Sequence, residues 1–317
     1  MPQEVIVSIQ CLVYNHEPYL RQCLDGFVMQ KTNFKFEAIM HDDASTDRSA
    51  DIIREYAEKY PDIIKPIFEK ENQYSKGFDA LARIMDAACK GKYIAVCEGD
   101  DHWIDPLKLQ RQVDFLEAHP DYSMCFTRAV CRVEAEGRDY PFGTAADRKY
   151  SGTELFQNWI VPTASIVYRK SVLSSDLYRS AFRSKNFLYG DAPLILSCAG
   201  CGDVFGFSDT TCVYRKHAGG VSSRITNSAE GVFQLRKHFL EFPVVFGPAY
   251  RRKAAESAVS ACMKSISIDL KNGKFPWRKI RTMLRISFPE TCLAVMRNLR
   301  KKRSSSTVSR RRRLRNI

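Results

Sequence analysis

Apolar residues along the first 120 positions follow two alternating spacings. Runs that are apolar on both faces occur at 4–14, 36–41, 63–68 and 92–97, and such runs are typical of buried parallel strands. Between them, apolar residues recur at helical spacing, which predicts amphipathic helices. This alternation of strand and helix predicts an α/β fold in which crossover helices connect the strands of a parallel sheet.

The pattern changes after residue 120. Strand-like runs at 122–133, 163–168 and 203–215 are separated by longer polar connections, and helical spacing dominates from about 226. The segment from 297 onwards is rich in Arg, Lys and Ser, which is typical of disorder. We therefore expect an α/β domain over 1–225, a helical extension over 226–296 and a basic, disordered tail over 297–317.

Charge is distributed unevenly along the chain. The formal net charge is +13 over 317 residues. Residues 251–317 hold 20 Lys and Arg against 3 Asp and Glu, so the remainder of the chain is slightly acidic. An acidic body argues against nucleic-acid binding as the main function.

The cysteines do not predict a disulfide framework. There are 11 of them, an odd number, and Cys11, Cys97 and Cys212 lie in apolar runs where cysteine packs as a small hydrophobe. Because the N-terminus also lacks a basic region followed by an apolar stretch, we expect a cytoplasmic protein with reduced thiols. Cys198 and Cys201 have the CxxC spacing but no second ligand pair, so we expect them to be structural.

Polar residues follow three of the predicted strands. Tyr14-Asn15 follows the first strand, Asp42-Asp43 the second, and Glu98-Gly-Asp-Asp101 the fourth. In an open parallel sheet, ligands bind at the carboxyl ends of the strands. Paired carboxylates suit Mg²⁺, which takes its other ligands from phosphates and water. The alternative for each Asp pair is a turn that caps the next helix.

Two nucleotide-binding classes lack their motifs in this chain. No Gly-x-Gly-x-x-Gly follows the first strand, which argues against a dinucleotide-dependent dehydrogenase. No Walker A sequence is present, which excludes the P-loop class.

Five motifs occur in order along the chain: VSIQCLVYN (7–15), HDDASTD (41–47), KYIAVCEGDDHW (92–103), YGD (189–191) and YRKH (214–217). With them the chain resembles the family 2 glycosyltransferases of the GT-A fold, bacterial surface-polysaccharide type, from about Val5 to Ser222. The resemblance implies a Rossmann-like, nucleotide-binding mixed sheet flanked by helices. It also divides the domain into a nucleotide-sugar-binding half over 1–120 and an acceptor half over 121–225.

The resemblance assigns roles to the residues of the donor site. It implies that Tyr14 packs against the uracil of the donor and that Asp43 hydrogen-bonds the uracil or ribose. It places Asp100 near the ribose or metal. It makes Asp101 a ligand of Mg²⁺ or Mn²⁺ bridging the diphosphate, and His217 a neighbour of the diphosphate with a further metal contact.

The resemblance also makes Asp191 the general base, although an aspartate before Ala192-Pro193 is equally typical of a helix N-cap. The motif reads Glu-Gly-Asp-Asp where many family members have Asp-x-Asp, so whether Glu98 or Asp100 also binds the metal stays open. No Gln-x-x-Arg-Trp follows Asp191, which favours a single-addition enzyme over a processive polymerase.

These implications together predict a metal-dependent, inverting glycosyltransferase. It is expected to move a sugar from a nucleotide-sugar donor, with a UDP-sugar favoured, to a glycan or lipid-linked acceptor in cell-surface polysaccharide biosynthesis. The alternative is a non-catalytic nucleotide-sugar-binding or membrane-associated scaffold protein with the same fold.

The basic C-terminal region predicts a further partner. The amphipathic stretch 277–296 and the runs Arg300–Arg303 and Arg310–Arg313 favour peripheral binding to the anionic inner face of the cell membrane. The alternative is a solvated tail. No aromatic residue lies within 297–317 to stack on bases, so we expect no nucleic-acid partner.

Overall fold

The computed structural model describes residues 4–286. Residues 4–185 and 189–217 form one compact unit, the sheet unit, and residues 186–188 and 218–286 form a second, the helical unit. The main division therefore falls after His217, before the boundary at 225 that the sequence predicted. The predicted tail at 297–317 lies outside the described residues.

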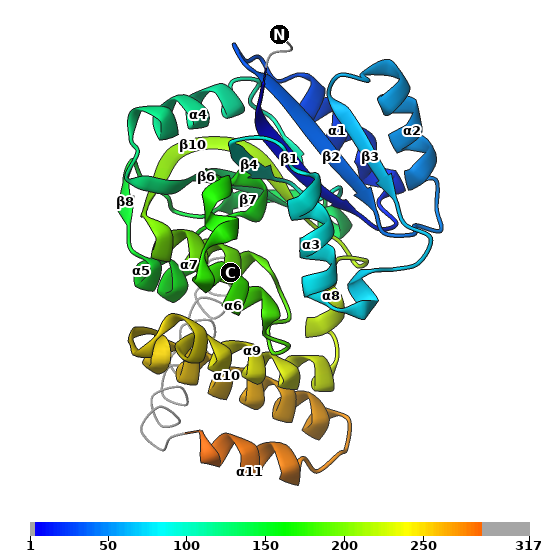
Figure 1. Ribbon diagram of the computed structural model, residues 1–317. Helices are drawn as coiled ribbons and strands as arrows, with labels where there is room; N and C mark the ends of the chain where they lie inside the picture. Colours follow the sequence, from blue (N-terminus) through cyan, green and yellow to red (C-terminus); the bar gives the residue numbers. More distant parts are fainter. Residues whose placement is uncertain (1–3, 287–317) are drawn as a thin grey trace, which may run out of the picture. The chain divides into compact units, whose positions relative to one another are not determined.

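The sheet unit is built on a sheet of ten strands, of which β3, β2, β1 and β4 lie side by side in Figure 1. The main path has the order β3-β2-β1-β4-β9-β6-β10-β5, while β7 pairs with β6 and β8 with β10. The strands are β1 (Val5–Val13), β2 (Lys35–Asp42), β3 (Ile64–Phe68), β4 (Tyr93–Val96), β5 (His102–Trp103), β6 (Tyr122–Val133), β7 (Arg138–Phe142), β8 (Arg148–Tyr150), β9 (Val167–Arg169) and β10 (Asp203–Lys216).

The sheet is mixed, which confirms the predicted class of fold. Strands β1 to β4 pair in parallel, as the alternation of strand and helix predicted. Strand β9 is antiparallel to both β4 and β6, and β6 is parallel to β10. The prediction of a strand at 163–168 is wrong for its first half. Thr163–Ser165 forms a 3₁₀ turn, in which both the amide and the hydroxyl of Ser165 donate to the carbonyl of Pro162.

Two hydrophobic clusters cover the two faces of the sheet. The side chains of β2 alternate between them, with Ala38 and Met40 in the first cluster and Ile39 in the second. The first cluster includes side chains of α1 (Glu17–Val28), α2 (Ser49–Lys59) and α4 (Lys108–Ala118). The second includes side chains of α3 (Phe78–Ala88), α5 (Gly152–Asn158), α6 (Asp176–Arg183) and α7 (Asp191–Cys201). Helices on both faces leave the carboxyl ends of the parallel strands accessible to a ligand.

The helical unit contains α8 (Val221–Thr226), α9 (Ala229–Phe246), α10 (Arg251–Lys271) and α11 (Trp277–Arg285). Helices α9 and α10 pack along each other, and α10 also contacts α11. Phe233 and Phe242 of α9, together with Ala258 and Val259 of α10, are buried. Within residues 4–286, no helix combines the length and the hydropathy that a membrane span requires.

Candidate functional site

The ends of β1, β2 and β4 meet at one edge of the sheet. The amide of Asp43 donates to the carbonyl of Val13 at 2.9 Å, and that of Gly99 to the carbonyl of Leu12 at 3.0 Å. Asn15 has a left-handed backbone, φ 57°, and its side-chain oxygen accepts from the amide of Thr46 at 2.8 Å. The three polar segments predicted at strand ends are therefore neighbours in the fold.

Asp47, the last residue of the second motif, links the starts of two helices. Its two carboxylate oxygens accept from the amide of Ser49 at the start of α2 and from the amide of Glu17 at the start of α1, each at 3.0 Å. An aspartate at helix N-termini satisfies amides that have no partner within the helix. This residue thus ties two helices together below the candidate site.

Asp43 is buried, and its carboxylate holds the loop that follows β3. One oxygen accepts from the amide of Gln73 at 2.6 Å and the other from the amide of Tyr74 at 3.0 Å. Asp42 is also buried and accepts from the amide of Ser45 at 3.2 Å. The predicted contact of Asp43 with uracil or ribose stays a prediction, and the structure adds a role in positioning the loop.

Two tyrosines lie exposed near this loop. Tyr14, which directly follows β1, is 36% exposed, and Tyr74 is 40% exposed. An exposed aromatic ring at a strand end offers a face on which a nucleobase can stack. The stacking role predicted for Tyr14 fits this exposure, and Tyr74 is an aromatic neighbour that the sequence did not indicate.

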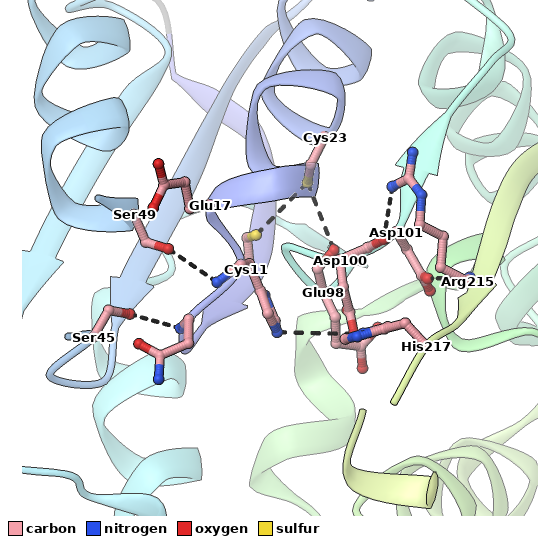
Figure 2. Close-up of polar contacts among 12 residues, drawn as sticks. Cys11, Glu17, Cys23, Ser45, Ser49, Glu98, Asp100, Asp101, Arg215 and His217 are labelled. Atoms are coloured by element: carbon pink, nitrogen blue, oxygen red, sulfur yellow. Dashed lines mark hydrogen bonds and ion pairs between the residues drawn. The ribbon is translucent and has the colours of Figure 1, made fainter. Parts of the chain in front are cut away.

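The acidic turn, Glu98 to Asp101, directs its carboxylates to different partners. Oδ2 of Asp100 lies 2.9 Å from Nε2 of His217 and 3.8 Å from Nε2 of His16 (Figure 2). Oδ1 of Asp101 instead accepts from the backbone amide of Arg215 at 2.8 Å, and Asp101 is 2% exposed. The structure therefore brings His217 together with Asp100, whereas the sequence paired His217 with Asp101. The roles of Asp101 and His217 as metal ligands stay predictions.

Arg215 holds the acidic turn from the side of β10, and the sequence did not assign it any role. Its guanidinium donates to the carbonyl of Asp100 at 2.7 Å and to Glu134 at 2.9 Å, and a third contact reaches Gln22 of α1. It also lies over the ring of Tyr19, 5.1 Å from the centroid. The only available signal was its place inside the motif at 214–217.

Burial and mutual repulsion shape the charges of the acidic turn. Burial raises the pKa of Glu98 to about 8, and the negative charges of Asp100 and Asp191 add to the shift. Burial also raises the pKa of Asp100, but the hydrogen bond from His217 and the charges of His16 and His217 outweigh it, so this pKa lies below its usual value. Glu98 is therefore protonated at neutral pH while Asp100 is ionised.

Asp191 begins α7, and its carboxylate accepts from the amide of Ala192 at 2.7 Å. The N-cap residue of α7 is Gly190, so Asp191 occupies the first helical position and is not the N-cap that the alternative made it. Burial raises the pKa of Asp191 to about 6. A general base works best with a pKa near the operating pH, so this pKa suits base catalysis. Its role as base stays a prediction.

Three further residues of the motifs and of the CxxC pair have different exposures. His102 is buried, and burial lowers its pKa to about 4. Cys198 is buried in α7 and Cys201 is exposed, and both are free thiols. The structural role expected for the CxxC pair stays a prediction.

The side chains at this site can be compared with what a divalent cation needs. Within residues 4–286, no three His, Cys, Asp or Glu side chains converge as a metal centre. The ionised Asp100 and the facing His217 supply two candidate ligands. Mg²⁺ typically uses one or two carboxylates and completes its shell with phosphate oxygens and water. The residues present therefore fit a cation that arrives with a diphosphate.

Residues 8–175 match the family model described as Glycosyl transferase family 2. Among curated proteins, the chain is 35% identical over 233 residues to the uncharacterized protein Rv1520 of Mycobacterium tuberculosis. That match covers 73% of this chain and 65% of the mycobacterial protein, so the chain spans just under two thirds of this relative's length.

Solved structures share the fold at low sequence identity. TarS from S. aureus in complex with UDP-GlcNAc has a TM-score of 0.58 at 16% identity, covering 92% of this chain and 79% of the TarS chain. The mannosyltransferase PcManGT from Pyrobaculum calidifontis in complex with GDP-Man and Mn²⁺ has a TM-score of 0.55 at 17% identity, covering 93% and 87%. These likenesses establish the GT-A type of fold.

Proposed function

Because the chain belongs to glycosyl transferase family 2, we propose that it transfers a glycosyl group from a nucleotide-sugar donor to a hydroxyl acceptor. The observation that carries the proposal is the acidic turn at the end of β4, where an ionised Asp100 faces His217 beside the ends of β1 and β2. This is the edge of an open α/β sheet at which nucleotides bind.

We favour a uridine nucleotide as the donor. TarS is described with UDP and UDP-GlcNAc, and the exposed Tyr14 provides a face for a nucleobase in this chain. PcManGT is described with GDP-Man, so a guanosine donor is the nearest alternative. Direct comparison of the two nucleotides decides between them.

A divalent cation, Mg²⁺ or Mn²⁺, completes the proposed site. Asp100 and His217 are the side chains that face each other there, and Asp101 lies one position further along the turn. When bound, such a cation neutralises the charge that develops on the leaving diphosphate. Glu98 is protonated at neutral pH, which keeps the local negative charge low before the donor binds.

Asp191 is the proposed general base, and the reaction is a single displacement. The acceptor oxygen forms a bond with the anomeric carbon as Asp191 takes the hydroxyl proton. The bond from that carbon to the diphosphate oxygen breaks, and the nucleoside diphosphate leaves with the electron pair. One displacement inverts the anomeric configuration. Base assistance of this type contributes about 10²–10⁴-fold to the rate.

The proposed acceptor is a glycan or a lipid-linked glycan of cell-surface polysaccharide synthesis, with the enzyme on the cytoplasmic face of the membrane. Support comes from the resemblance of the five motifs to the surface-polysaccharide branch of the family. A non-catalytic, donor-binding scaffold has the same fold and is the competing function. Turnover separates the two, because a scaffold binds the nucleotide without releasing it as a product.

Nucleotide release from UDP-, GDP- and dTDP-sugars, each with Mn²⁺ or Mg²⁺, tests the proposal. We expect release from one nucleotide class, dependence on the cation, and a loss of about 10²–10⁴-fold in Asp191→Asn with donor binding retained. Donor binding without turnover in the wild type, with a range of saccharide acceptors present, would favour the scaffold. Absence of both binding and turnover overturns the proposal.

A further inference from the structure

The corner between α10 and α11 exposes large apolar side chains. Phe275 is 63% exposed, Trp277 is 71% exposed and Leu284 is 58% exposed. The rings of Phe275 and Trp277 lie together, with centroids 5.0 Å apart. Two adjoining aromatic rings held largely in solvent are costly unless something covers them.

The packing of α11 explains why these side chains face outward. The buried Lys279 forms an ion pair with Asp269 of α10 at 2.6 Å, and Arg278 pairs with Glu230 of α9 at 3.0 Å. The Lys279 pair anchors the buried side of the short helix, while the Arg278 pair is exposed to solvent. Trp277, Arg281 and Leu284 follow one another at helical spacing and remain on the exposed side.

Positive charge surrounds the apolar residues. Lys271, Lys274 and Arg281 are exposed, and no Asp or Glu occurs between residues 270 and 286. Among the described residues, none of these three cations has an acidic partner within 4 Å. We define the α10–α11 surface as Phe275, Trp277 and Leu284 together with Lys271, Lys274 and Arg281.

We infer that the α10–α11 surface docks on an anionic lipid bilayer. Tryptophan and phenylalanine favour the boundary between headgroups and acyl chains, while Lys and Arg contact anionic headgroups. Each cation close to such a surface contributes about 1 kcal/mol. Leu284, on the same side as the aromatic pair, can pack against the acyl chains of a bilayer. A nucleic-acid backbone has no apolar surface for it to contact. The charge and the apolar side chains thus point to the same partner.

This inference goes beyond the proposed transfer reaction and uses none of its residues. Membrane binding and turnover are measured separately, so either can fail without the other. If both hold, the enzyme is concentrated where a lipid-linked acceptor is present.

Full-length protein mixed with vesicles of phosphatidylcholine, with or without phosphatidylglycerol, provides the test. We expect binding to the anionic vesicles that weakens with added salt, and little binding to pure phosphatidylcholine. Brominated acyl chains should quench the tryptophan fluorescence of bound protein. Trp277→Phe should lose this quenching, because Trp277 is the tryptophan of the α10–α11 surface and the other two, Trp103 and Trp159, belong to the sheet unit. The variant should keep most of the binding, because phenylalanine is also a large apolar side chain.

Variants separate the apolar contribution from the charge. We expect Phe275→Ala/Trp277→Ala to weaken binding by about tenfold or more. The two rings become buried when the protein docks on the bilayer, and each then contributes over 1 kcal/mol. Val244→Ala removes a comparably exposed apolar side chain, 76% exposed on α9, and should leave binding unchanged. Lys271→Gln/Lys274→Gln/Arg281→Gln should weaken binding by about tenfold or more and flatten its salt dependence, while Lys31→Gln/Lys35→Gln should not.

Several results would overturn the inference. One is vesicle binding by the Phe275→Ala/Trp277→Ala variant as strong as that of the wild type, with an unchanged circular dichroism spectrum. A second is vesicle binding without any quenching of Trp277, which would assign the contact to another part of the chain. A third is a stable homodimer that Trp277→Ala dissociates, which would make a second copy the occupant. Tighter binding to duplex DNA than to anionic vesicles would equally exclude a bilayer as the partner.

Discussion

Two pairs of adjacent aspartates lie at the ends of the two strands that flank β1, and the fold uses them differently. In the pair at the end of β2, both oxygens of Asp43 accept backbone amides of the loop at 73–74. In the pair after β4, Asp100 faces His217 while Asp101 accepts the amide of Arg215. One pair thus organises a loop, and the other places a carboxylate against a histidine. Identical residues at equivalent strand ends do not imply equivalent chemistry, because the partners come from other parts of the chain.

The sharpest test of this comparison is the exchange of one carboxylate for an amide in the acidic turn. We expect Asp100→Asn to lower kcat/KM by about 100-fold or more, since even groups that only support a metal ligand contribute about 10–100-fold. Asp101→Asn keeps an oxygen that can accept the amide of Arg215, so a smaller loss is expected. Steady-state kinetics and Mn²⁺ titration in the presence of UDP measure both. A larger loss in a folded Asp101→Asn would return the main ligand role to Asp101.

Removal of Arg215 breaks the support of the acidic turn. Arg215→Met removes a buried guanidinium and leaves the carbonyl of Asp100 and the one-third-exposed Glu134 without their charged partner. We expect the free energy of unfolding of the sheet unit to fall by about 1–3 kcal/mol, the cost of leaving a buried polar group without its hydrogen bond. Urea unfolding measures it. Arg54→Met, which removes an exposed pair with Asp51, serves as the control and should change stability by about 0.5 kcal/mol or less.

The pH dependence of turnover reports on Asp191. Its pKa of about 6 means that the base is deprotonated above that pH and protonated below it. We expect kcat/KM to fall about tenfold for each pH unit below 6 and to level off above it. A profile measured from pH 4.5 upwards on a folded enzyme checks this. An acidic limb that stays near pH 4 would indicate that another group, or none, accepts the proton.

Substitution of Asp43 should have a milder effect than substitution of Asp100 in the acidic turn. Asp43→Asn replaces one acceptor of a backbone amide with a donor, at a cost of about 1–3 kcal/mol. We expect faster hydrogen exchange at the amides of Gln73 and Tyr74 and a higher KM for the donor, with kcat little changed. Asp79→Asn, at an exposed pair with Arg83, is the matched control. A loss confined to kcat would place Asp43 in the chemistry instead.

The last prediction concerns stability, through Glu98. Its pKa is raised from 4.5 to about 8 in the fold, so the folded state holds a proton that the unfolded state has lost between these values. Stability therefore falls as pH rises through this window. Glu98→Gln removes the effect, and we expect its Tm to exceed that of the wild type at pH 8 and to differ little at pH 4. Thermal unfolding across this range measures the difference, and parallel curves for the two proteins would contradict it.

The sequence predicted the site better where the evidence is local. Runs that are apolar on both faces located β1 to β4, and parallel pairing then places their carboxyl ends at one edge, which brings Asn15, Asp43 and Asp100 together. The strand predicted at 163–168 failed in its first half because Ser165 bonds back to Pro162, an interaction that hydrophobic spacing does not reveal.

Partners from distant segments could not be predicted in this way. Arg215 meets Asp101 across 114 positions, and no pattern in either segment indicates which of two adjacent aspartates receives its amide. The raised pKa of Glu98 likewise depends on burial beside Asp100 and Asp191, which come from separate elements. The sequence therefore indicated the acidic turn but not which partner each of its carboxylates contacts.

By itself, the sequence determined the order of strands and helices in the first 120 residues and the edge at which polar residues gather. These follow from spacing and composition, which are properties of short segments and need no knowledge of long-range contacts. The family followed from the resemblance of five motifs. Only the tertiary structure decided that Asp100 faces His217, that Asp43 holds a loop, and that Trp277 is left largely exposed. The physical reason is that a carboxylate or an aromatic ring takes its role from the atoms packed against it, and those atoms are chosen when the chain folds.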